Sequence, residues 1–220
     1  MEVDTKIIKT IENFLNEFEE KDYITICEKE TENAVEDCFK CKIYNEFSLQ
    51  HELGLYLRNN LENSTILFEK NVKSFEGGKG FNNWEKHEID IVIIDNSTKK
   101  KYAIELKFPL NGQYPEQMFQ FIKDISFMEQ VKKEIKFEQT YCLTLVNDEG
   151  FYSANGNRKS DGIYKYFRQK QNEKLPVSIK EPIKHRNQTK EKEITINYQK
   201  PIEWKKINNN DALRYYLLTI

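Results

Sequence analysis

Residues 88–108 read EIDIVIIDNSTKKKYAIELKF, two apolar runs separated by a short polar stretch. The runs Glu88–Asp95 and Lys101–Phe108 are rich in β-branched and aromatic residues, which favour β-strands. The polar residues 96–99 between the runs are typical of a tight turn. This stretch therefore predicts an antiparallel β-hairpin at the centre of the fold.

Three charged residues interrupt the apolar strands of this hairpin. If the turn is centred between Ser97 and Thr98, Asp90 lies opposite Glu105, with the two Cβ atoms about 5 Å apart. Lys107 points to the same face as Glu105, because side chains alternate along a strand. Two facing carboxylates repel each other, so a fold that keeps them needs a compensating cation.

The oxygen ligands indicate which cation this is. Carboxylates without His or Cys suit Mg²⁺ or Mn²⁺, which keep several waters and bind substrate phosphate through their open positions. A further carboxylate, Glu52, falls on the apolar side of a predicted helix, where it costs free energy unless it is paired or coordinated. We therefore expect Glu52, Asp90 and Glu105 to surround one divalent ion, with Lys107 within reach of its water.

The elements around the hairpin follow from apolar periodicity. Ser48 is a suitable N-cap for a helix that runs to about Leu61. An extended segment over residues 65–75 precedes the hairpin, and a helix from Pro115 to about Ile135 follows it. The inward residues of the first helix would be Leu49, Leu53, Tyr56 and Leu57, and those of the second Met118, Phe121, Ile122, Ile125, Met128 and Val131.

A strand over residues 137–146 completes this core. The long helix before it lets this strand run parallel to the second strand of the hairpin. The chain is therefore predicted to have an α/β fold, with a mixed β-sheet, an antiparallel hairpin and flanking helices. We expect residues 1–46 to be an N-terminal helical extension, residues 47–150 the core, and residues 151–220 a basic, β-rich C-terminal extension packed on the core.

The two extensions have weaker patterns than the core. An apolar stripe over residues 4–21 predicts an N-terminal helix that Asp4 could cap. In the C-terminal extension we expect a short helix over residues 161–169 and strands near residues 193–198 and 213–220.

The charged residues of the hairpin also carry a family resemblance. Asp90, the step Glu105-Leu106-Lys107 and the helical Glu52 resemble the PD-(D/E)XK nuclease superfamily, whose core is restriction-endonuclease-like. The resemblance covers about residues 47–146. It implies that Asp90, Glu105 and the Leu106 carbonyl bind the metal, and that Lys107 orients or activates a water.

The resemblance extends to other positions and has one departure. Glu52 matches a helical acidic residue that binds the metal directly or through water. Some branches also carry a Gln on the following helix, and either Gln117 or Gln120 could match it. Residue 89, before Asp90, is Ile where the pattern has Pro.

The resemblance implies a nuclease that depends on Mg²⁺ or Mn²⁺, an endonuclease or related phosphodiesterase that cleaves DNA. Restriction or another defence role is a biological role common in this class of enzyme. An alternative is a catalytically inactive nucleic-acid-binding or assembly protein on the same fold, because a fold alone does not determine activity. A third reading is a structural α/β module with an incidental acidic patch. The sequence leaves open which form of DNA is cleaved and whether the chain is a homodimer.

The charge of the chain is unevenly distributed. Residues 1–157 contain 19 Lys and Arg against 29 Asp and Glu, a net charge of −10, while residues 158–220 contain 15 against 7, a net charge of +8. This asymmetry indicates either a basic face for a polyanion such as DNA or a solvated charged tail. The candidate phosphate-binding residues are Arg158, Lys159, Lys165, Arg168 and Lys170. An equally strong alternative is an amphipathic helix whose aromatic residues, Tyr164, Tyr166 and Phe167, lie in the core.

Several classes of protein are disfavoured by the composition. The sequence has no run near the roughly 18 apolar residues of a membrane span, and its start has no signal-peptide pattern. We therefore expect a cytoplasmic protein without a membrane partner. Four cysteines do not make a disulfide framework, and the Cys38–Cys41 pair lacks the second Cys/His pair of a zinc site.

Overall fold

The computed structural model of the protein describes residues 3–17, 42–75, 84, 86–110, 112–156, 158–168, 173–182, 192–207 and 213–220. The helices and strands are α1 (Val3–Asn16), α3 (Glu46–Asn60), β1 (Ser64–Asn71), the 3₁₀ turn η2 (Val72–Ser74), β2 (Glu88–Asp95), β3 (Lys101–Lys107), α4 (Tyr114–Glu134), β4 (Gln139–Val146), α5 (Tyr164–Phe167), β5 (Ser178–Lys180), β6 (Glu193–Thr195), β7 (Lys205–Lys206) and β8 (Arg214–Thr219).

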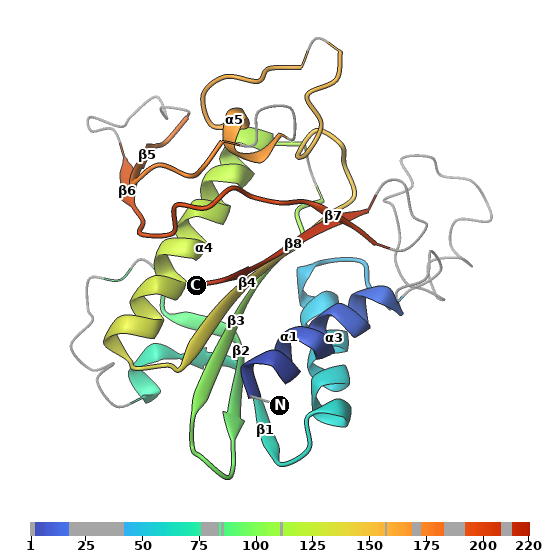
Figure 1. Ribbon diagram of the computed structural model, residues 1–220, viewed down its shortest axis with the longest axis vertical. Helices are drawn as coiled ribbons and strands as arrows, with labels where there is room; N and C mark the ends of the chain where they lie inside the picture. Colours follow the sequence, from blue (N-terminus) through green and yellow to red (C-terminus); the bar gives the residue numbers. More distant parts are fainter. Residues whose placement is uncertain are drawn as a thin grey trace.

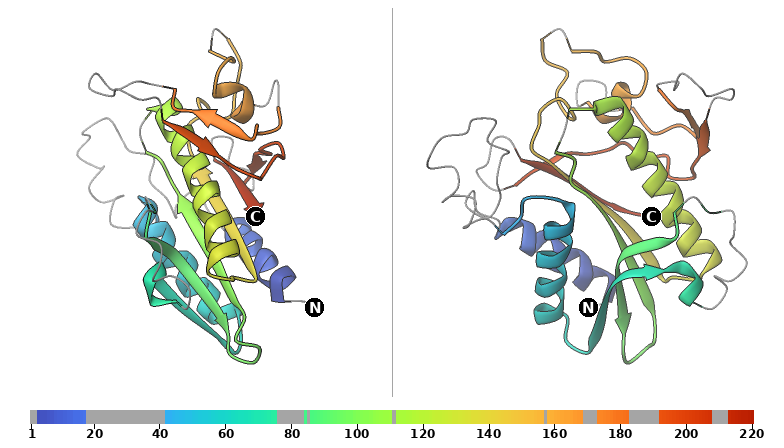
Figure 2. Two further views of the ribbon diagram at one scale, coloured as in Figure 1. Left: turned by 90° about the vertical axis from the view of Figure 1, so that its left-hand side faces the viewer. Right: turned by 180° about the vertical axis from the view of Figure 1, so that it is seen from behind.

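A six-stranded sheet with the order β1-β2-β3-β4-β8-β7 forms the middle layer. Helix α4 packs on one face of this sheet, and α1 and α3 pack on the other, as Figures 1 and 2 show. Strand β4 runs parallel to β3, whereas the other pairs of this sheet are antiparallel. The predicted α/β class, with a mixed sheet and flanking helices, is therefore confirmed.

The central hairpin has the register that the sequence predicts. Ile91 lies opposite Ile104 across β2 and β3. Asp95 stabilises the turn, because its carboxylate accepts hydrogen bonds from the Ser97 N–H and the Thr98 hydroxyl, each at 2.8 Å. This turn lies at the outer end of the molecule (Figure 1).

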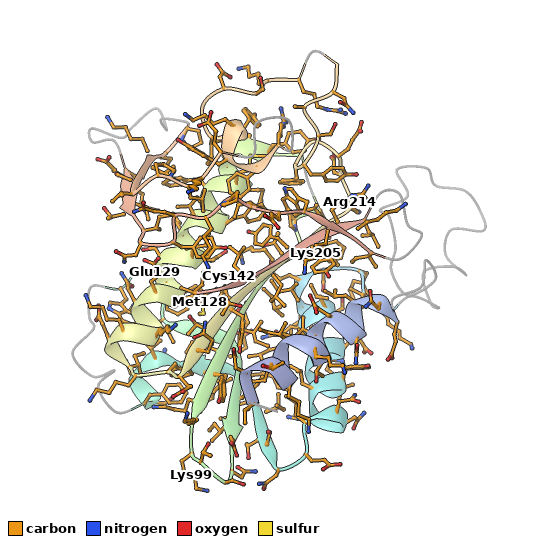
Figure 3. The ribbon with its side chains drawn as sticks, in the orientation of Figure 1. Lys99, Met128, Glu129, Cys142, Lys205 and Arg214 are labelled. Carbon is orange, nitrogen blue, oxygen red and sulfur yellow. The ribbon has the colours of Figure 1, made fainter. Side chains whose placement is uncertain are left out.

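Alternation along the strands divides the core into two layers. On β3, Ala103 packs with the α4 side of the core, whereas Ile104 and Leu106 pack with the α1 and α3 side. Because side chains alternate, Glu105 belongs to the face that α4 covers. Figure 3 locates this region: Cys142, the register partner of Glu105, lies near the centre of the molecule, and Lys99 lies at the outer end of the hairpin.

The start of α3 differs from the prediction. Asn45, and not Ser48, is the N-cap: its side chain accepts a hydrogen bond from the Ser48 N–H at 2.8 Å, and the Ser48 hydroxyl accepts one from the Asn45 N–H at 2.9 Å. This reciprocal pair is a capping box, in which Ser48 is the third helical residue. The helix therefore begins three residues earlier than predicted, which places Glu46 in its first turn.

The C-terminal part of the chain is built into the core. Strand β8 pairs with β4 from Tyr141 to Val146, so it is an integral strand of the main sheet and not a separate layer. The Trp204 indole donates a hydrogen bond to the Phe167 carbonyl at 2.7 Å and packs against the ring of Tyr216. The predicted C-terminal extension thus contributes two strands, β7 and β8, to the main sheet and several buried aromatic residues to the core.

At the other end of the chain, the predicted N-terminal helix forms as α1 and packs on α3 through its apolar stripe. Asp4 accepts a hydrogen bond from the Tyr141 hydroxyl. Residues 18–41, which include Cys38 and Cys41, lie outside the described residues. Within the described ranges, no helix has both the length and the apolar character needed to span a membrane.

Candidate active site

Two buried carboxylates on adjacent strands share one ammonium group. The Lys86 Nζ atom lies 3.6 Å from the Asp90 Oδ1 atom and donates a hydrogen bond to Glu105 Oε1. The Lys107 Nζ atom lies 4.0 Å from the same Glu105 oxygen. The structure therefore brings together Asp90, Glu105 and Lys107, the three residues that hairpin geometry selected, and adds Lys86, which the sequence analysis did not identify.

Asp90 is held in place by two hydrogen bonds, one to its side chain and one to its backbone carbonyl. Its Oδ2 atom accepts a hydrogen bond from the Leu106 N–H at 2.7 Å. The Gln50 side chain on α3 donates to the Asp90 carbonyl at 2.7 Å. Burial raises the pKa of Asp90, and the Lys86 ammonium and the Leu106 N–H oppose that rise. The contact with Leu106 also places the backbone of that residue, a predicted metal ligand, beside the Asp90 carboxylate.

Lys107 is held by carboxylates from two helices. Its ammonium donates to the Glu46 Oε1 atom at 2.9 Å, and the second Glu46 oxygen accepts from the Phe108 N–H at 3.1 Å. The Asp124 Oδ2 atom lies 4.0 Å away. Burial disfavours the charged ammonium, but the carboxylates of Asp124 and Glu46 outweigh this effect and raise the pKa of Lys107. Lys107 therefore donates hydrogen bonds at neutral pH.

The helical carboxylate at this site is Glu46 and not Glu52. Glu52 contacts His51 at 3.1 Å, and its side chain is 28% exposed. It borders a hollow between α1 and α3 together with Phe14 and Tyr56. Because each helical residue turns about 100°, Glu52 points away from the flank of α3 on which Gln50 reaches Asp90. The described contacts therefore do not bring Glu52 to the two strand carboxylates.

Asp124 on α4 is the other acidic residue that sequence analysis missed. It is buried, and burial raises its pKa against the lowering effects of Lys107 and Lys86. Its Oδ2 atom, like the Oε2 atom of Glu105, has no hydrogen-bond partner among the described residues. A buried acceptor without a partner costs about 1–3 kcal/mol. These two atoms indicate a place for a bound cation or water.

We call Glu46, Asp90, Glu105 and Asp124 the carboxylate cluster. With Lys86 and Lys107, these four acidic groups have a formal charge of −2 when all are ionised, which one divalent cation would balance. In the described part of the chain, no group of three His, Cys, Asp or Glu residues is arranged to hold a metal alone. Mg²⁺ keeps several waters and needs only one or two carboxylates, so Asp90 and Glu105 fit such an ion.

Comparison with protein-family models, with curated proteins and with solved structures found no match. The functional argument therefore depends on the geometry and charge of the cluster itself.

A groove of about 510 Å³ lies beside the cluster, between α4 and β6. Lys86 and Asp124 line it, whereas Asp90 and Glu105 do not.

The predicted auxiliary residue Gln120 also lines this groove, while Gln117 lies in the first turn of α4, seven residues before Asp124. Further lining residues are Trp84, Lys123, Phe127 and Lys192. The groove is thus lined by amine and aromatic groups next to the carboxylate cluster. Its volume is in the range common for ligand-binding sites.

Three of the five predicted phosphate-binding residues of the C-terminal part have partners within the chain. The Arg168 side chain donates to the carbonyls of Gly150 and Lys159 and is only 4% exposed, so it stabilises the fold and cannot reach a nucleic acid. Arg158 pairs with Glu149, and Lys165 pairs with Glu173 at 3.1 Å. Lys170 lies outside the described residues.

The aromatic residues of the same segment follow the alternative interpretation. Phe167 is buried in the core on the α4 side of the sheet, and Tyr164 and Tyr166 pack against that core. The ring of Tyr164 also lies 4.1 Å from the buried Arg168 guanidinium. The segment around α5 therefore supports the fold through Phe167 and Arg168, while the Lys165 ammonium lies 5.0 Å from the ring of Tyr166.

Proposed function

We propose that the protein is a nuclease that depends on Mg²⁺ or Mn²⁺ and hydrolyses DNA phosphodiester bonds, as an endonuclease or related phosphodiesterase. The observation that carries this proposal is that the buried carboxylates of Asp90 and Glu105 both contact the Lys86 ammonium, with Lys107 beside them. The core order of helix, three strands, helix and parallel strand agrees with the PD-(D/E)XK resemblance. A restriction-endonuclease-like core is part of the proposal.

The roles of the residues follow from their contacts. Asp90 and Glu105, with the Leu106 carbonyl, would hold the divalent ion. The Asp124 Oδ2 atom, which accepts no hydrogen bond from the described residues, would be available to the ion or to its water. The bound ion would supply a Lewis acid that stabilises negative charge on the phosphate. Lys107, held by Glu46, would donate a hydrogen bond that orients the attacking water. Glu46 acts as a positioning residue for Lys107.

The groove beside the cluster is the proposed place for the substrate. DNA is a polyanion, and carboxylates repel it unless cations lie close by. Lys86, Lys123 and Lys192 line the groove, and Trp84 and Phe127 add aromatic surface there. Binding of DNA should therefore weaken as the salt concentration rises. The alternative is a nucleic-acid-binding or assembly protein without turnover, for which the same groove would suffice.

Purified wild-type protein should cleave or nick DNA in the presence of Mg²⁺ or Mn²⁺. Chelation with EDTA should stop the reaction, and Ca²⁺ should support binding with little cleavage, because its looser coordination aligns the reacting water less well. The measurement is gel analysis of duplex, branched and single-stranded substrates with each ion. Absence of cleavage for all three substrates with both Mg²⁺ and Mn²⁺ would favour the binding protein over the enzyme.

Replacement of Glu46 should slow cleavage, whereas the same replacement of Glu52 should not. Glu46→Gln removes the charge that holds Lys107, and we expect cleavage to slow about 10- to 100-fold, as for other residues that orient a metal site. Glu52→Gln changes the same chemical group on the same helix and should leave the rate within about twofold. Initial rates at saturating Mg²⁺, with thermal unfolding as a check on folding, test this. An equal or larger loss for Glu52→Gln would contradict the assignment.

A further inference from the structure

Lys86 lies where two buried carboxylates require a cation. We propose that Lys86 is a built-in competitor of the divalent ion: its ammonium neutralises Asp90 and Glu105 while the metal is absent, and it must leave them when the metal binds. This inference depends on the proposed function for the identity of the ion. It assigns a regulatory role at the site to a residue outside both strands of the hairpin.

The first argument is the position of the ammonium. It contacts one oxygen of Asp90, at 3.6 Å, and one oxygen of Glu105. Lys107 reaches only Glu105 of these two carboxylates, at 4.0 Å, because Glu46 holds its ammonium at 2.9 Å. The described contacts thus leave Lys86 as the cation between the strand carboxylates. An ammonium and a divalent ion bound to the same oxygens would repel each other strongly, so the two cations exclude each other.

The second argument is access from solvent. Glu105 is only 1% exposed, and neither it nor Asp90 lines the groove. The Lys86 side chain is 31% exposed and does line the groove. On this side of the cluster, Lys86 therefore lies between the groove and the two strand carboxylates, Asp90 and Glu105. A cation that arrives through the groove reaches them only if Lys86 moves.

The third argument is that Lys86 has a place to go. The groove has a volume of about 510 Å³, which is ample for one ammonium group. On its wall, the ring of Phe127 lies 5.6 Å from the Lys86 ammonium, and the carboxylate of Asp124 lies nearby. A lysine has a flexible stem and a compact charge, so it can move between these partners. In the groove, the displaced ammonium would face the phosphate of the proposed substrate.

The direct test is the dissociation constant of Mg²⁺, measured by calorimetry without DNA. Lys86→Met keeps an unbranched side chain of nearly the same length but removes the charge, so we expect Mg²⁺ to bind about 10- to 100-fold more tightly. This range corresponds to the loss of one hydrogen bond to a charged group. Lys86→Arg keeps the competing charge and should stay close to wild type. Lys100→Met is the matched control, because Lys100 pairs with the exposed Glu138 at the outer end of the hairpin.

A second measurement is thermal unfolding in EDTA and in Mg²⁺. Without metal, Lys86→Met leaves two buried carboxylates without their shared cation, and the melting temperature should fall by roughly 3–12 °C relative to wild type. Saturating Mg²⁺ should remove this difference. If Lys86→Met does not fold, amine labelling of the wild type tests the same point by mass spectrometry. Lys86 should react faster after Mg²⁺ is added, whereas Lys107 should not.

The outcomes separate this inference from the proposed function. Tighter Mg²⁺ binding by Lys86→Met, with or without measurable binding by wild type, supports the competition. Equal affinities for wild type and Lys86→Met, or labelling of Lys86 that Mg²⁺ does not change, overturn the competition and leave the metal-dependent nuclease standing. Absence of Mg²⁺ and Mn²⁺ binding in both proteins overturns the competition and the metal-dependent nuclease together.

Discussion

Asp90→Asn is expected to reduce Mg²⁺-dependent cleavage by at least about 10³-fold. The reason is the loss of negative charge at a proposed metal ligand, since a metal ion contributes several kcal/mol to stabilisation of the transition state. The fold should survive, because an asparagine oxygen can still accept the hydrogen bond from the Leu106 N–H. Calorimetry should show that Mg²⁺ binding is lost together with activity.

The matched control for Asp90→Asn is Glu138→Gln. It makes the same carboxylate-to-amide change, but Glu138 pairs with Lys100 on the exposed surface. An exposed pair contributes only about 0–1 kcal/mol, so activity should stay within about twofold of wild type. If Asp90→Asn cleaved DNA at the wild-type rate, Asp90 could not be a ligand of a catalytic metal.

Lys107→Met is expected to lower the rate of cleavage by about 10²- to 10⁴-fold while Mg²⁺ still binds. The expected loss has a different cause from that of Asp90→Asn. Lys107 donates to Glu46 and lies beside Glu105, so its removal takes away the proposed donor to the attacking water but none of the proposed ligands of the ion. The rate at saturating Mg²⁺, measured with the dissociation constant of the ion, distinguishes the two variants.

Two comparisons make the Lys107 result interpretable. Lys107→Arg keeps the charge with a different shape and should recover part of the rate, because the guanidinium can still donate to Glu46. Thermal unfolding of Lys107→Met should show some loss of stability, since Glu46 and Asp124 lose a cationic neighbour. Wild-type activity in Lys107→Met, or a rate loss that disappears when more Mg²⁺ is added, would contradict the proposed role.

The carboxylate pair could be predicted because it depends on local rules. Alternation along a strand has a period of two, so the turn alone determines which side chains lie opposite each other. Asp95 stabilises that turn, and Ile91 pairs with Ile104 as expected. The parallel direction of β4 follows in the same way from the long helix before it.

The helical carboxylate could not be predicted as easily. Asn45 and Ser48 are both good N-caps, and the choice of Ser48 left Glu46 outside the helix. The Asn45–Ser48 capping box was the signal in the sequence that could have corrected the start. Even with the correct start, periodicity reveals the apolar stripe of α3 but not which flank of that stripe meets the end of the sheet. That orientation placed Glu46 and Gln50 at the site and Glu52 away from it.

The sequence by itself determined the α/β class, the hairpin register and the meeting of Asp90, Glu105 and Lys107, because each follows from contacts between residues close in the chain. Only the tertiary structure brought in Lys86 and Asp124 and buried Arg168 among backbone carbonyls. The placements of Asp124 and Arg168 depend on how α4 and the C-terminal segment pack against the sheet. Side-chain packing between distant segments has no period in the sequence, so charge and motif alone could not reveal it.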